Sequence, residues 1–99
     1  MTEESKRKGW YITPDGERID MPEPANEDGT FSLKQLQEAV GGYIEPVIPN
    51  PGVAMTKGKV ILADEEGVLK QLPINLAATV MCGRPIVGNV AVIDEECLA

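Results

Sequence analysis

The sequence predicts a small α+β domain, in which a mainly antiparallel sheet carries one principal helix on a face and a second, short helix. Two observations predict this class. Residues 33–40 repeat apolar side chains at helical spacing, whereas the segments around them are short, alternate apolar with polar residues and are separated by turn residues. The resulting order is two strands, a helix, three strands, a short helix and a strand, which is typical of α+β folds.

The 99 residues predict one domain, 1–99, whose core comes from residues 31–99. This second part holds 23 of the 25 Val, Ile, Leu and Phe residues. Residues 1–30 hold the other two together with 12 charged residues. We therefore expect residues 1–30 to form an acidic hairpin and linker that lie at an edge of the core.

Residues 10–21 predict the β-hairpin. Apolar and polar side chains alternate over Trp10–Ile12 and again over Ile19–Met21. Between them lies Thr13–Gly16, in which proline, aspartate and glycine supply the dihedral angles that tight turns need. The polar, proline-broken stretch 22–29 predicts the linker.

Residues 33–40 predict the principal helix. Ser32 and Gln35 have the spacing of a capping box, in which each side chain bonds the backbone of the other residue. Gly41 and Gly42 follow the last apolar position, and glycine takes the left-handed conformation that ends helices without steric cost. The helix is therefore expected to end at Val40.

The remaining segments are shorter and are bounded by turn residues. Pro46 places its strand at a sheet edge, because proline cannot donate to a ladder. Asn75 is a suitable N-cap for the short helix. The expected elements are a strand over 43–48, a loop over 49–58, a hairpin of strands 59–63 and 68–72, a helix over 76–80 and a strand over 86–93.

Composition excludes several classes of function. Without histidine the chain has no Ser–His or Cys–His base and no imidazole ligand for zinc, so we expect no enzyme, no metal site and no cofactor. The net charge of −7 argues against direct binding to nucleic acid. No apolar run reaches the roughly 20 residues that span a membrane, and residues 1–10 lack an apolar signal core. We expect a cytoplasmic protein with two free thiols, Cys82 and Cys97.

A partner-binding surface is the first candidate site. Tryptophan and tyrosine are enriched at contact hot spots, and a run of carboxylates attracts a basic surface. The expected contact residues come from the hairpin, the linker and the loop 49–58: Trp10, Tyr11, Asp15, Glu17, Asp20, Glu23, Glu27, Asp28, Val53 and Met55.

A ligand site is the alternative. A helix N-terminus attracts phosphate, and cationic side chains complete such a site. Asn75 and Arg84, with Lys57 or Lys59, would hold a nucleotide-like signal, in a homodimer or a larger oligomer.

Three motifs resemble a family of small uncharacterised proteins from bacteriophages and mobile elements. They are LKQLQEAVGGYIEPV at 33–47, DEEGVLKQLPIN at 64–75 and IVGNVAV at 86–92. Genes of that family accompany anti-restriction and other counter-defence genes. With the acidic composition and the missing histidine, we expect a non-catalytic inhibitor in the host cytoplasm, anti-CRISPR or anti-restriction in kind, which occupies a host defence protein such as one that binds nucleic acid. The resemblance itself suggests a role in host takeover or defence evasion. It implies no catalytic residue.

Overall fold

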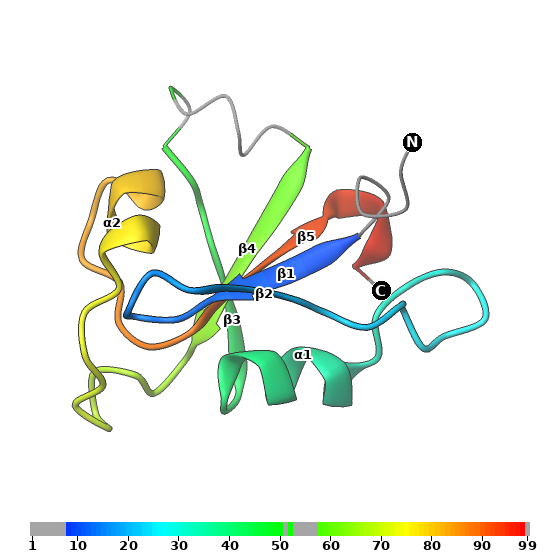
Figure 1. Cartoon of the computed structure of the whole chain (residues 1–99), viewed down its shortest axis with the longest axis horizontal. Helices are drawn as coiled ribbons and strands as arrows, with labels where there is room; N and C mark the ends of the chain where they lie inside the picture. The colour runs from blue at the N-terminus through cyan, green and yellow to red at the C-terminus, as the bar shows by residue number, and fades with distance from the viewer. Residues whose placement is uncertain (1–7, 51, 53–57, 99) are drawn as a thin grey trace.

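The computed structural model describes residues 8–50, 52 and 58–98. Within them the chain forms a five-stranded sheet and helices on both sides of it (Figure 1). The elements are β1 (Gly9–Ile12), β2 (Arg18–Asp20), α1 (Leu33–Val40), β3 (Ile44–Val47), β4 (Lys59–Asp64), α2 (Leu76–Cys82), β5 (Val90–Asp94) and the 3-10 helix η3 (Glu95–Cys97).

The sheet has the strand order β2-β1-β5-β4-β3, and every neighbouring pair is antiparallel. The last strand, β5, lies at the centre, where Val92 pairs with Trp10 of β1 on one side and with Ile61 of β4 on the other. The expected mainly antiparallel α+β sheet is confirmed. Its edges are β2 and β3, and Pro46 lies in β3, where its missing N–H removes the fewest ladder bonds.

Both faces of the sheet are covered, whereas the sequence predicted one principal helix on one face. Side chains of β5 alternate between two cores: Ala91 and Ile93 pack on the α1 side, and Val90 and Val92 pack on the α2 side. All four are buried. The short helix α2 is therefore a second layer, and this double coverage explains why β5 is apolar at consecutive positions.

The principal helix begins and ends as predicted. The Ser32 side chain accepts from the Gln35 N–H at 3.1 Å, and Gln35 Oε1 accepts from the Ser32 N–H at 3.0 Å, which completes the capping box. Gly41 follows the helix with φ +91°, in the left-handed region. The short helix also begins after Asn75 as predicted, and it continues to Cys82.

The N-terminal hairpin is confirmed, and β2 lies at an edge of the sheet, but the hairpin also contributes to the core. Strand β1 pairs with β5 along its whole length. Met21 is buried in the core on the α1 side, and Tyr11 packs against the same core. The core was expected to come from residues 31–99 because only Val, Ile, Leu and Phe were counted. Residues 1–30 contribute Met and aromatic side chains to it instead.

The second predicted hairpin is wrong. Residues 65–71 form consecutive turns, in which the Lys70 N–H donates to the Glu66 carbonyl at 3.0 Å. The Leu72 N–H, just after them, donates to the Gly67 carbonyl at 3.1 Å. The last strand is also shorter than predicted. It begins only at Val90, because Gly88 has φ +79° and interrupts the extended backbone before it.

Candidate interaction surface

The turn between β1 and β2 holds two carboxylates at the end of the hairpin. The Thr13 N–H donates to the Glu17 carbonyl and the Gly16 N–H to the Thr13 carbonyl, both at 2.9 Å. The Glu17 N–H also donates to Thr13 Oγ1 at 3.1 Å. Gly16 has φ +91°, a conformation that favours glycine. Asp15 and Glu17 are thereby exposed on a hydrogen-bonded turn.

The segment 22–30, predicted as a polar linker, is held by hydrogen bonds of its own. Asp28 Oδ1 accepts from Thr30 Oγ1 at 2.7 Å and from the Thr30 N–H at 3.0 Å, and both bonds lower the pKa of Asp28. The Asn26 N–H donates to the Thr30 carbonyl at 3.1 Å, and the Gly29 N–H donates to the Asn26 carbonyl at 3.0 Å. The acidic side chains of this segment therefore have fixed backbone positions.

Gln35 connects the acidic segment to α1. Besides its bond within the capping box, Gln35 Oε1 accepts from the Ala25 N–H at 2.9 Å. Its Nε2 group donates to the Glu23 carbonyl, also at 2.9 Å. One side chain thus stabilises the start of α1 and fixes the path of the chain beside it.

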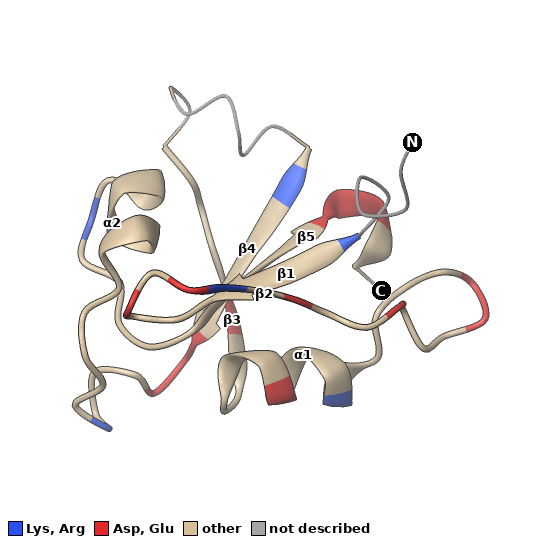
Figure 2. Ribbon diagram, in the orientation of Figure 1, with Lys and Arg blue, Asp and Glu red and all other residues tan. Residues whose placement is uncertain are grey.

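These turns produce a row of carboxylates that we call the acidic edge. Figure 2 shows it as red segments running from the hairpin turn through β2 into the following loop. Residues 15–28 contain one cation, Arg18, and all six acidic residues among them are exposed. The acidic edge consists of Asp15, Glu17, Asp20, Glu23, Glu27 and Asp28.

Trp10 lies half-buried beside the acidic edge, near two cations. The Arg18 guanidinium carbon is 3.8 Å from the centroid of the Trp10 ring, and Lys59 Nζ is 5.3 Å from it. Both distances permit cation–π attraction. Each cation also has a carboxylate: Arg18 Nε is 3.7 Å from Asp20 Oδ1, and Lys59 forms an ion pair with Asp94. The Trp10 ring therefore lies close to a cation of β2 and a cation of β4, each of which also has a carboxylate nearby.

The structure brings only part of the predicted contact set together. Trp10 packs against the core on the α2 side of the sheet, whereas Tyr11 packs against the core on the α1 side, so the two rings do not share a surface. Val53 and Met55 lie outside the described residues. Arg18 beside Trp10 was not among the predicted contact residues, although the turn length already places both side chains on one face of the hairpin.

Two residues of the alternative ligand site, Asn75 and Lys59, are bonded within the chain. Asn75 is fully buried, and its Nδ2 group donates to the carbonyls of Ile12 at 2.9 Å and Gly88 at 2.8 Å. Its Oδ1 atom accepts from the Ala78 N–H at 3.0 Å. Lys59 is paired with Asp94, and Arg84 follows the opposite end of α2. Lys57 lies outside the described residues.

The two cysteines are free and buried. Burial raises the pKa of the Cys82 thiol, although Arg84 opposes this effect. Burial also raises the pKa of Cys97, and the nearby charge of Asp94 adds to the effect. Both thiols are therefore protonated at neutral pH, and a protonated thiol is a poor nucleophile.

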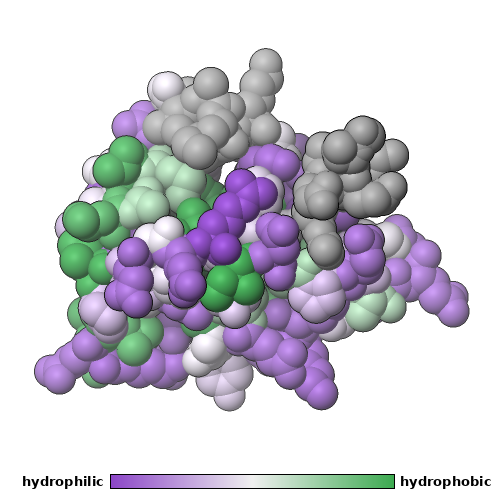
Figure 3. Space-filling view, in the orientation of Figure 1, coloured by the Kyte–Doolittle hydropathy of each residue, from purple (hydrophilic) through white to green (hydrophobic). Residues whose placement is uncertain are grey.

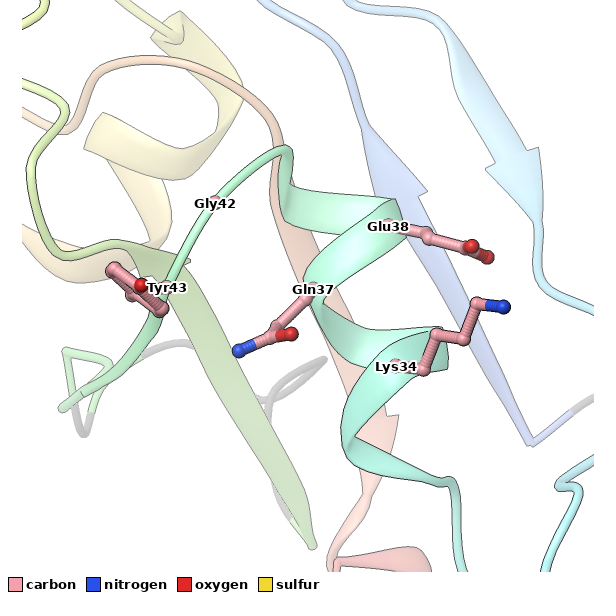
Figure 4. Close-up of a pocket in the computed structure, with 5 residues that line it drawn as sticks. All are labelled: Lys34, Gln37, Glu38, Gly42 and Tyr43. Carbon is pink, nitrogen blue, oxygen red and sulfur yellow. The ribbon is translucent and has the colours of Figure 1, made fainter.

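An open pocket of about 250 Å³ lies between α1 and the start of β3 (Figure 4). In the close-up the side chains of Lys34 and Glu38 point away from Tyr43, so no pair of reactive groups converges on the pocket. Among residues 8–50, 52 and 58–98, no three Asp, Glu or Cys side chains are grouped so that they could hold a metal ion. Across the same ranges, no helix is both long and apolar enough to cross a membrane.

Comparison with known proteins gives one match. Residues 8–97 match the family model described as "Domain of unknown function (DUF3846)". No curated protein matches the chain, and no solved structure does. The matched range includes the whole sheet, both helices and the acidic edge.

Proposed function

This chain belongs to the DUF3846 family, and from that premise we propose that it is a non-catalytic protein that binds a basic surface of a partner through its acidic edge. The observation that carries the proposal is the row of six exposed carboxylates along β2 and its flanking turns. Such a row raises the rate of encounter with a basic surface and disfavours acidic partners.

The chemistry of the acidic edge favours a partner that itself binds nucleic acid. Proteins hold phosphate groups with Lys and Arg side chains. A row of carboxylates carries the same negative charge as phosphate, so the same Lys and Arg side chains can bind it. Trp10 and Arg18 lie beside the row and belong to the residue types that dominate binding energy at interfaces. A protein seated on such a surface would exclude the nucleic acid.

We propose a host defence protein as that partner, on the basis of the resemblance of three motifs to bacteriophage and mobile-element proteins. The protein would then act in the host cytoplasm as an inhibitor of the anti-CRISPR or anti-restriction kind. A binding role also suits the side chains available, because the chain has no histidine and the pKa of each of its two thiols is raised. The nucleotide-trapping alternative has no comparable support, because Asn75 is consumed by bonds within the chain.

The test compares two variants of equal net charge in capture of proteins from a host lysate. The first variant neutralises three carboxylates of the acidic edge: Asp15→Asn, Glu17→Gln and Glu27→Gln. The control neutralises three exposed carboxylates elsewhere: Glu38→Gln, Glu45→Gln and Glu65→Gln. Substitution is preferable to deletion of residues 1–29, because β1 and Met21 belong to the sheet and its core.

We expect the unmodified chain and the control to capture the same partner, and the acidic-edge variant to lose it. Capture should also weaken steeply as ionic strength rises from about 0.05 M to about 0.5 M, since exposed charges are screened over that range. Added nucleic acid should compete with the protein for the partner. Equal losses in both variants, or capture that salt does not weaken, would refute the role of the acidic edge.

A further inference from the structure

The Trp10 ring holds a guanidinium group that belongs to the chain itself. The guanidinium carbon of Arg18 lies 3.8 Å from the ring centroid, and Asp20 Oδ1 lies 3.7 Å from Arg18 Nε. The pairing of β1 with β2 explains this arrangement, because it places Asp20 opposite Trp10 and Arg18 diagonally across from it on the same face. An aromatic ring beside a carboxylate is a combination that binds guanidinium groups. This face of the hairpin can therefore hold an arginine side chain.

Of the two cations near the ring, Arg18 is held less firmly than Lys59. The side chain of Arg18 is 57% exposed, and its distance of 3.7 Å to Asp20 is longer than a hydrogen bond. The side chain of Lys59 is 24% exposed and donates a hydrogen bond to Asp94. Lys59 Nζ is also 5.3 Å from the ring centroid, close to the limit of about 6 Å for cation–π attraction. A competing cation would therefore displace Arg18 from the ring.

The charges around the ring attract such a competing cation. Arg18 is the one cation among residues 15–28, and carboxylates of the acidic edge lie on both sides of it in the sequence. On the face shown in Figure 3, mainly hydrophilic side chains lie over β1 and β2, in the middle of the molecule, whereas hydrophobic side chains gather over α2 at the left. A positively charged group is therefore drawn toward the part of the surface where the Trp10 ring lies.

We propose that Trp10 and Asp20 form a binding site for an arginine side chain of the partner, and that Arg18 occupies this site in the free protein. The proposal rests on the function proposed above, since it names the side chain that a basic partner contributes. Arginine is favoured over lysine, because a planar guanidinium stacks on an aromatic ring and also binds a carboxylate through two donors. The two cations of the chain agree with this preference, since the guanidinium lies nearer the ring than the ammonium of Lys59. Trp10 then contributes the contact, and Arg18 competes for it.

The fluorescence of Trp10, the one tryptophan of the sequence, provides the test. The full chain is titrated at low ionic strength with a short arginine peptide, and separately with a lysine peptide of the same length and charge. Peptide concentrations from about 1 μM to about 1 mM suit weak association. The arginine peptide should change the emission of Trp10 and bind about two- to fivefold more tightly than the lysine peptide, which is the factor that one exposed cation–π contact represents.

Two variants that each lose one positive charge test the competition by Arg18. Arg18→Gln removes the guanidinium from the ring. The matched control is Arg84→Gln, which removes an exposed arginine beside β3, three strands away from β1 in the sheet. Arg18→Gln should bind the arginine peptide about two- to fivefold more tightly than the control does. Because the two variants have equal net charge, long-range attraction does not account for this difference. Far-UV circular dichroism should show the same fold for both, since both side chains are exposed.

Equal affinity of Arg18→Gln and Arg84→Gln for the arginine peptide overturns the proposal. An arginine peptide that leaves the Trp10 emission unchanged, or that binds no more tightly than the lysine peptide, overturns it as well. These results are independent of the capture experiment, because the peptides bind without the partner. Capture that salt weakens, together with an unresponsive Trp10, would retain the acidic edge and remove the arginine site. A preference for the arginine peptide in a chain that captures no partner would support the site and refute the proposed function.

Discussion

Replacement of Asn75 by alanine should be among the most destabilising single changes in this chain. The side chain is fully buried and makes three hydrogen bonds, which join the end of β1, the N-terminus of α2 and the turn before β5. At about 1 kcal/mol net for each bond, the loss is about 3 kcal/mol. A domain of this length has a total unfolding free energy of about 5–15 kcal/mol, so the variant should still fold.

Thermal and urea unfolding measure this effect directly. A loss of about 3 kcal/mol should lower Tm by roughly 12–24 °C, since each kcal/mol shifts a domain of this size by about 4–8 °C. The midpoint of urea unfolding should fall while the slope stays constant, because the surface exposed on unfolding hardly changes. A Tm within about 3 °C of the unmodified chain would refute the structural role of Asn75 and reopen its assignment to a ligand.

Asn75→Asp provides the matched comparison. The carboxylate can still accept from the Ala78 N–H, but it faces the Ile12 and Gly88 carbonyls without a proton to donate. This environment raises the pKa of the introduced group, so its stability deficit is largest at neutral pH and shrinks as the pH falls toward the ordinary aspartate value, about 4. If Asn75→Asp is as stable as the unmodified chain at pH 7, the two carbonyl bonds are not formed.

Two further predictions concern titration and thiol reactivity. Burial opposes ionisation of Asp64, but hydrogen bonds from Lys70 Nζ and the Glu66 N–H, both at 2.8 Å, prevail and lower its pKa. Asp64 therefore stabilises the fold above the ordinary aspartate pKa of about 4 and loses this effect as the pH falls below it. Lys70→Met should lower stability at pH 7 and flatten the acid limb of stability measured by urea unfolding between about pH 3 and 7; an unchanged acid limb would contradict the role of the pair. Cys82 and Cys97 should react with a thiol reagent far more slowly in the folded chain than in denaturant, and rapid modification of the folded chain would show that one of them is accessible.

The elements that the sequence predicted correctly are those with local causes. Helix α1 needs only the reciprocal bonds of Ser32 and Gln35 and the left-handed Gly41, all within ten residues. The hairpin needs only its turn. In both cases the hydrogen bonds that decide the structure join near neighbours in the sequence, so the local residue pattern is enough to predict them.

The elements that the sequence predicted wrongly depend on distant contacts. Residues 68–72 alternate well enough for a strand, but β5 takes the place beside β4, and Lys70 is bonded to Asp64 instead. The apolar run that ends in Met81 and Cys82 does not reveal that α2 covers the opposite face of the sheet from α1. A count of carboxylates predicted the acidic edge. The separation of Trp10 from Tyr11 follows from the alternation of side chains along a strand, which the predicted hairpin already implied.

The three bonds of the Gln35 side chain restrict which residue can occupy position 35. In most capping boxes glutamate and glutamine are interchangeable, because only an acceptor is needed. Here the amide must also donate to the Glu23 carbonyl, and glutamate has no hydrogen to give at neutral pH. Gln35→Glu would release the Glu23 carbonyl while leaving α1 capped. The orientation of the acidic edge can therefore be changed by one substitution that leaves the helix intact.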